Sequence, residues 1–159
     1  MESDDKSLQE RYALETWCFG CGPANEKGLR IRSLPVADDA DEVVLDWTPQ
    51  PHHEAFENVL NGGIIGTLMD CHSNWAAIWH LMRRDGLDDA PCCVTADFHV
   101  KLRRPTPTDG PLHLAARAVE SDGNKVVVEA ELSHDGVVTA TCRGTFVSVG
   151  PGHPGFNRW

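Results

Sequence analysis

The sequence predicts an α+β fold in which an antiparallel sheet wraps around one long central helix. Apolar residues recur at three- and four-residue spacing from Gly62 to about Arg84, over a wide helical face. Strand-like segments dominate the rest of the chain, and the dipeptides Asp122-Gly123 and Asp135-Gly136 are hairpin turn signals. A helix this apolar is not stable on a surface, so a sheet curled around it is the economical solution.

The predicted elements before the helix are short. Residues 1–15 are polar and indicate a tail or a short helix, and residues 16–28 form a loop of Gly, Cys, Pro and Asn. Residues 29–34 and 43–47 predict two strands around an acidic turn, and a loop rich in Pro and His follows to residue 58.

The helix carries signals at both ends. The side chain of Asn61 is suited to cap the first N–H groups. Arg83 and Arg84 complement the negative end of the helix dipole, and Gly86 lies just beyond them as a stop.

Four strands after the helix complete a predicted sheet of six. In residues 93–103, the apolar side chains alternate with mostly polar ones in period two, which predicts one buried face. Residues 112–121, 125–133 and 137–149 follow as strands, joined mainly by hairpins. We therefore expect one domain over residues 16–149, with a polar N-terminal tail of residues 1–15 and a C-terminal tail of residues 150–159.

Composition narrows the classes of function. The chain has 159 residues, of which 41% are hydrophobic, and a net charge of −10. That charge argues against nucleic acid as a partner, because phosphate backbones demand a basic surface. No apolar run is long enough to span a membrane, and the acidic start lacks the features of a signal peptide. We expect a cytoplasmic protein with no membrane partner.

Six cysteines allow a disulfide, a metal or a reduced-thiol interpretation. Cys18 and Cys21 form one C-x-x-C motif, but a structural zinc site normally has a second pair at a suitable distance. The others are scattered over the predicted helix and strands: Cys71, Cys92, Cys93 and Cys142. We expect reduced thiols that shape a tight loop and no bound metal; zinc at Cys18 and Cys21 stays as the alternative.

The first residues of the predicted helix are the main candidates for catalysis. The glycines Gly62 and Gly63 let a ligand approach the backbone, and a helix N-terminus offers unpaired N–H groups. Asp70 lies inside the apolar run, where a carboxylate is costly unless it is paired or used. Together they supply donors for a carbonyl oxygen and a base or nucleophile, as acyl transfer requires.

Three ordered motifs resemble the hotdog-fold thioesterases, especially the group related to phenylacetate-pathway and THEM-type acyl-CoA thioesterases. They are residues 61–70 with Gly-Gly and Asp70, the strand segment 95–105, and the terminal hairpin segment 140–147. The opening residues 18–29, with Cys-Phe-Gly-Cys-Gly, also recur in some members. The resemblance covers roughly residues 18–149 and implies a homodimer or a dimer of dimers, with active sites shared between subunits.

The resemblance also implies roles for single residues. The Gly63 N–H would hold the thioester carbonyl oxygen, Asp70 would act as general base or nucleophile, and the Thr95 hydroxyl would assist. The family usually has His where this chain has Asn61, which can cap the helix and donate through its amide but carries no proton at neutral pH. His53 and Asn58, in the preceding loop, are the candidates to take over the role of the missing His.

Further substrate-binding candidates surround these residues. Asn74 shares the helical face of Asp70, and Thr67 could hydrogen-bond Asp70 or simply bond back to its own helix. The densest basic cluster is a candidate handle for the phosphates of coenzyme A, with salt bridges to the acidic surface as the alternative: Lys101, Arg103 and Arg104.

The function expected is hydrolysis of an acyl-CoA or acyl-carrier thioester, without a cofactor. Two alternatives stay open. One is a 2-enoyl-CoA hydratase, which usually pairs a carboxylate with His at a different spacing. The other is a non-catalytic hotdog protein that binds acyl-CoA or a small ligand. Asn61, in place of the usual His, favours this alternative, whereas the presence of Asp70 favours catalysis.

Overall fold

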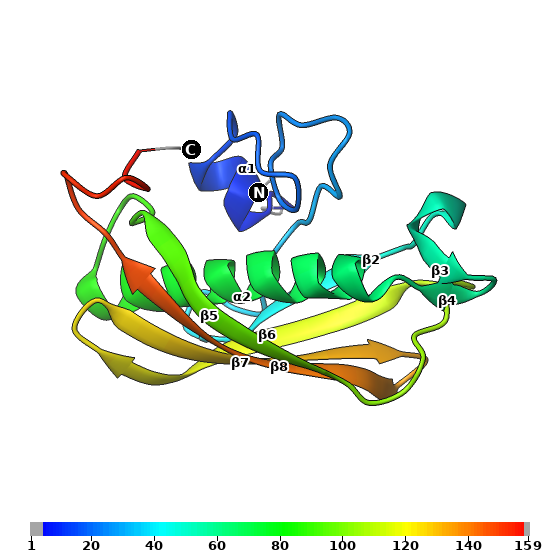
Figure 1. The fold of residues 1–159 in the computed structure, drawn as a ribbon. Helices are drawn as coiled ribbons and strands as arrows, with labels where there is room; N and C mark the ends of the chain where they lie inside the picture. The colour runs from blue at the N-terminus through cyan, green and yellow to red at the C-terminus, as the bar shows by residue number, and fades with distance from the viewer. Residues whose placement is uncertain (1–4, 158–159) are drawn as a thin grey trace.

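One long helix lies across one face of a curved sheet, and the N-terminal segment covers the other side of that helix (Figure 1). This computed structural model describes residues 5–157; the acidic start that bears on the signal-peptide prediction falls mostly in residues 1–4, outside the described part, as do residues 158–159. The order of the sheet is β1-β2-β6-β7-β8-β5, and every pairing is antiparallel. The predicted hotdog-type architecture is confirmed.

The helix α2, Gly62–Asp85, forms where the apolar periodicity predicts it. Asn61 Oδ1 accepts hydrogen bonds from the N–H groups of Gly63 and Ile64, and the helix ends at Gly86 in the left-handed conformation. The face of α2 that packs on the sheet is apolar and contributes much of the core, including the fully buried Leu68 and Met69.

The six strands of the main sheet agree with the sequence except at the N-terminal end. Their bounds are Leu34–Pro35 for β1, Val43–Trp47 for β2, Cys93–Leu102 for β5, Leu112–Asp122 for β6, Lys125–His134 for β7 and Val137–Ser148 for β8. Residues 29–33, predicted as strand, are irregular, because their backbone bonds the cysteine loop instead: the Leu29 N–H donates to Phe19 O and the Ile31 N–H to Gly20 O. The loop before α2 contains a short 3-10 helix, Pro51–His53, and a small hairpin of β3, Glu54–Phe56, and β4, Val59–Leu60.

The N-terminal segment is anchored to α2 by a buried polar network. Helix α1, Leu8–Tyr12, begins with a capping box formed by Ser7 and Glu10. Gln9 donates to Ser33 Oγ at 3.1 Å, and Ser33 bonds His72 Nδ1 on α2 at 2.8 Å. Burial lowers the pKa of His72 to about 4, so its ring is neutral and donates through Nε2 to Val43 O. His72 is therefore a core residue of the chain.

Strand β5 contradicts the predicted strict alternation. Its pairing with β8 slips between Thr95 and Asp97, so Ala96 is the extra residue of a β-bulge. Before the bulge Thr95 pairs with the buried Phe146, and after it Phe98 pairs with the buried Gly144; both side chains therefore face α2. The bulge shifts the phase of the strand by one residue, which the apolar pattern alone does not reveal.

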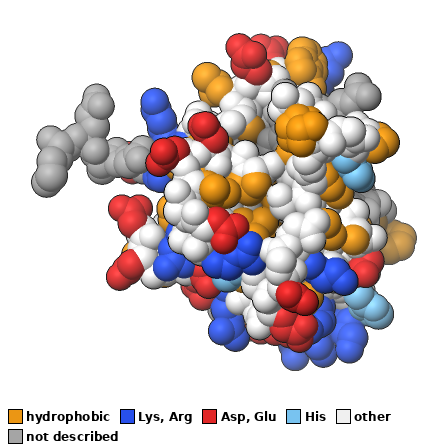
Figure 2. Space-filling view, turned by 90° about the vertical axis from the view of Figure 1, so that its left-hand side faces the viewer, with side chains coloured by type: hydrophobic (Ala, Val, Ile, Leu, Met, Phe, Trp, Pro, Cys, Tyr) orange, Lys and Arg blue, Asp and Glu red, His pale blue; other side chains and the backbone are white. Residues whose placement is uncertain are grey.

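The end of the molecule at which α2 finishes shows no large basic surface, because acidic and basic side chains are interspersed there (Figure 2). Figure 2 shows Lys and Arg side chains beside Asp and Glu in the lower part of this end, with apolar side chains exposed above them. Among residues 5–157, no helix is long and apolar enough to cross a membrane.

Candidate functional site

One stripe of α2 is left uncovered within the single chain. Gly62 and Gly63 are exposed, and Gly66, Thr67 and Asp70 are partly exposed further along the same helix. Strand β5 borders the stripe: the Phe98 ring lies 3.9 Å from an ideal Cβ at Gly66, and the Leu102 side chain 3.4 Å from one at Gly62. The stripe holds most of the residues to which the sequence assigns chemistry.

Among the described residues, Asp70 is held by a single side-chain hydrogen bond. The Thr95 hydroxyl donates to Asp70 Oδ1 at 2.7 Å, which the bulge at Ala96 makes possible by directing Thr95 toward α2. Within residues 5–157 Asp70 forms no ion pair. Burial raises the pKa of the Asp70 carboxyl, the bond from Thr95 lowers it in part, and the nearby Cys18 raises it again.

Asp70 and Thr95 line a cavity of about 410 Å³ between α2, β5 and the N-terminal loop. Trp17, Asn74 and Gly155 are also in its wall, and none of the described residues that line it is Lys, Arg or His. Asn74 Nδ2 donates to Cys93 O at 3.3 Å, and Asn74 Oδ1 has no hydrogen-bond partner among the described residues. The cavity thus offers one half-buried carboxylate in mostly uncharged surroundings.

The N-terminus of α2 at Gly62 and Gly63, called the helix mouth below, is separated from Asp70. Gly63 lies seven positions before Asp70, which is roughly 10 Å along a helix axis. The Gly63 N–H donates to Asn61 Oδ1 at 2.8 Å, so the donor that the sequence assigns to the carbonyl oxygen is engaged, and the Asn61 cap leaves the Gly62 N–H untaken. Within one chain, the Asp70 carboxylate and the N–H groups at the start of α2 are therefore too far apart to act on the same carbonyl group.

The remaining loop and helix candidates form bonds or turns within the scaffold. His53 is buried; its Nδ1 accepts from the Gln50 N–H and its carbonyl from the Asn61 N–H, so it positions the start of α2. Asn58, at a positive φ of 63°, forms the turn between β3 and β4. Thr67 donates to Gly63 O at 3.1 Å, so it bonds back to its own helix and does not reach Asp70.

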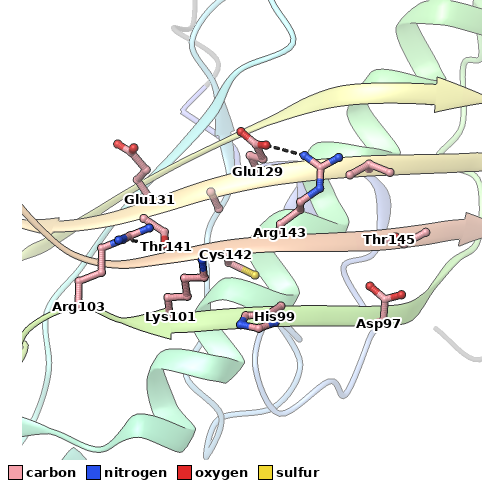
Figure 3. A pocket seen from close by; sticks show the side chains of 12 residues that line it. Asp97, His99, Lys101, Arg103, Glu129, Glu131, Thr141, Cys142, Arg143 and Thr145 are labelled. Carbon is pink, nitrogen blue, oxygen red and sulfur yellow. Dashed lines mark hydrogen bonds and ion pairs between the residues drawn. The ribbon is translucent and has the colours of Figure 1, made fainter.

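The basic cluster lies on the face of the sheet that is turned away from α2. Lys101 and Arg103 line a groove of about 750 Å³ there, among both acidic and basic neighbours (Figure 3). Arg103 donates to Thr141 Oγ1, and the neighbouring Arg143 is paired with Glu129 and Glu120. Arg104 follows outside this groove. The patch is therefore less positive than the sequence suggests.

Three thiols meet beside Asp70, which the sequence did not indicate. The Sγ atoms of Cys18, Cys21 and Cys71 all lie within 4.8 Å of one another. Hydrogen bonds with Cys21 and Cys71 lower the pKa of the Cys18 thiol, and the bonds to Cys18 raise the pKa of Cys21 and of Cys71. Cys71 lies on α2, far along the chain from Cys18 and Cys21, so the sequence contains no signal for this cluster.

Known proteins place the chain among thioesterases. Solved structures with a similar fold include a thioesterase superfamily protein from Shewanella loihica PV-4, 26% identical, covering 80% of this chain and 98% of that one, with a TM-score of 0.63. A phenylacetic acid degradation-related protein of Ralstonia eutropha JMP134 is 23% identical, covers 80% and 92%, and has a TM-score of 0.65. The PaaI protein from the phenylacetic acid degradation operon of E. coli is 18% identical, covers 80% and 85%, and has a TM-score of 0.66.

No curated protein sequence matches the chain. The family model described as Thioesterase superfamily matches residues 57–143, which include α2, β5, Asp70 and Thr95. The solved structures show the hotdog fold, and the family match shows that the chain belongs to the thioesterase superfamily.

Proposed function

We propose that the protein is a cytoplasmic enzyme that hydrolyses acyl-CoA or acyl-carrier thioesters to the free acid and thiol. The observation that carries the proposal is Asp70, a half-buried carboxylate in a cavity whose described lining has no basic side chain. Thr95 holds one carboxylate oxygen, and no described residue bonds the other. Such a carboxylate can take a proton from an attacking water or attack the thioester carbon itself. The developing oxyanion is assigned to the N-terminus of α2, where the Asn61 cap leaves the Gly62 N–H untaken.

The roughly 10 Å between Asp70 and its own helix mouth supports an active site shared by two copies of the chain. Strand β5 is at the edge of the sheet, with Phe98 42% and Leu102 57% exposed. A long edge strand with exposed apolar side chains invites pairing with another strand. A second copy is the occupant that we propose.

The contacts of β5 indicate how two copies would complete one site. Asp70 bonds Thr95 near the start of β5, whereas Gly62 lies beside Leu102 at its end. Antiparallel pairing of two β5 strands about their middle sets Thr95 of one opposite Leu102 of the partner subunit. The same pairing brings Asp70 toward Gly62 of the partner subunit, so that base and oxyanion donor face one substrate.

Release of thiol from a panel of acyl-CoA esters tests the function. We expect steady-state turnover with at least one ester, measured by a thiol-reactive dye, in a protein that sediments as a dimer or tetramer. Saturable binding of acyl-CoA without thiol release would replace the proposal with a ligand-binding protein, and hydration of a 2-enoyl-CoA without hydrolysis would replace it with a hydratase.

Arg103 and Arg104 are proposed as a handle for the phosphates of coenzyme A. The Arg103 side chain lies on the outer face of the sheet, but both residues directly follow Leu102, which lies beside Gly62 at the start of α2. Their joint replacement by Ala is expected to raise KM for a CoA ester about fivefold and to leave a pantetheine ester unchanged, as for screened surface charges. The effect is expected to shrink as salt is added. Arg117→Ala, on β6, is the matched control; equal losses for both esters would reject the role.

A further inference from the structure

The three-thiol cluster has the geometry of a metal site. Cys18 Sγ and Cys71 Sγ are 3.7 Å apart, and Cys21 Sγ completes a triangle in which no pair exceeds 4.8 Å. Thiolates bound to Zn²⁺ at about 2.3 Å in a tetrahedron lie about 3.8 Å apart. The cysteines are free thiols, so no disulfide accounts for their approach.

The loop around the cluster is shaped to bring the sulfurs together. A Cβ added at Gly20 would lie 2.3 Å from Cys71 Sγ, so only glycine lets the C-x-x-C loop sit on α2 at this point. The loop is fixed from behind, since the carbonyl groups of Phe19 and Gly20 accept hydrogen bonds from Leu29 and Ile31. A preformed set of ligands on a rigid loop and a core helix lowers the cost of ordering a metal site.

The position of the cluster leaves one coordination site open. In the part of the chain that the structure describes, no fourth His, Cys, Asp or Glu joins the group. Cys18 is exposed, and all three cysteines line the 410 Å³ cavity that Asp70 also lines. Structural zinc sites are usually closed by four protein ligands, whereas sites with three keep the fourth position for solvent or substrate.

We propose that Cys18, Cys21 and Cys71 bind one thiophilic divalent metal ion, of which Zn²⁺ fits best, with a solvent molecule from the cavity as the fourth ligand. Three sulfur ligands select zinc over magnesium or calcium, which prefer oxygen. The C-x-x-C motif lacks a second pair in the sequence, and the fold supplies Cys71 in its place. The metal site shares its cavity with Asp70, but binding of the ion can be measured without any hydrolysis, so the two proposals are tested separately.

The test is a titration of the full-length reduced protein with Zn²⁺ alone, under argon and against a chromophoric chelator. We expect one ion per chain, and we expect Co²⁺ to give thiolate charge-transfer absorption with the intense visible bands of tetrahedral coordination. Cys18→Ser, Cys21→Ser and Cys71→Ser should each weaken binding by at least about 100-fold, beyond the usual effect of outer-shell changes. Cys92→Ser is the matched control, because its thiol bonds Gly155 O and is not part of the cluster.

Two further variants distinguish metal binding at this cluster from metal binding by scattered thiols or by the Asp70 carboxylate. Gly20→Ala keeps all three thiols but crowds Cys71, so it should weaken Zn²⁺ binding without changing the number of titratable thiols. Asp70→Asn should still bind one Zn²⁺ per chain, because Asp70 does not belong to the cluster. Binding well below one ion per chain by the wild type, an octahedral Co²⁺ spectrum, or equal losses in Cys92→Ser and Cys71→Ser would overturn the proposal. Formation of a disulfide in place of metal binding would assign the cluster to redox chemistry instead.

Discussion

Asp70→Asn is expected to lower kcat for thioester hydrolysis by about 10²-fold or more and to leave the fold intact, in line with general-base contributions. The amide retains the shape of the carboxylate and can still accept the bond from Thr95. It cannot take a proton or attack carbon. Because the role exists in the transition state, the loss should fall on kcat and not on the affinity for substrate.

The measurement is steady-state thiol release by protein that has the wild-type sedimentation coefficient and melting temperature. Asp88→Asn, in the exposed turn after α2, removes the same charge at a distance and is expected to keep full turnover. Thr95→Val removes the hydrogen bond but retains the carboxylate, so its loss should be smaller than that of Asp70→Asn. Near-wild-type turnover by assembled Asp70→Asn protein would show that the proposed mechanism is wrong.

Mixing two inactive variants is expected to restore activity, because each proposed site takes Asp70 from one chain and the helix mouth from the other. Gly62→Val crowds Leu102 and the oxyanion donor, whereas Asp70→Asn removes the base. In a mixed dimer one site carries both changes and the other carries neither. Random reassortment of equal amounts should then give about a quarter of the wild-type turnover.

The measurement is turnover after the two variants are denatured together and refolded, with each variant refolded alone as control. Co-refolding Asp70→Asn with Thr95→Val protein is a second control, since both changes fall on the same half-site and should not complement. Failure of the first pair to recover, in protein shown to contain mixed dimers, would place the whole site within one chain.

The sequence was a reliable guide to the elements whose stability is local. The apolar period and the caps at Asn61 and Gly86 predicted α2 closely, and Asp-Gly turn signals located the hairpins. The sequence predicts a strand over residues 29–34, yet the N–H groups of Leu29 and Ile31 donate to carbonyl groups of the cysteine loop and not to a neighbouring strand. That choice depends on a partner distant in sequence, which local propensity does not contain.

The candidate site was predictable as a set of residues but not as an arrangement. Asp70 and Thr95 were named from a motif, and the structure joins them through a bulge that the alternation of β5 conceals. Thr67 had two possible partners, and only the fold shows that it bonds Gly63 O. Cys71 was missed as a partner of Cys18 because spacing along the chain carries no information about a loop laid across a helix.

The extra residue in β5 also limits how this chain can change in length. Thr95 and Phe98 are three positions apart, so without an extra residue they would face opposite sides of the sheet. Because Ala96 is that extra residue, both side chains face α2. A one-residue deletion here would turn one half over, exposing the apolar side chains or carrying Asp97 and His99 toward the core. Substitutions at Ala96 leave the step intact, whereas a frame-preserving loss of one codon removes it. Closely related chains should therefore differ in the identity of this residue far more readily than in its presence.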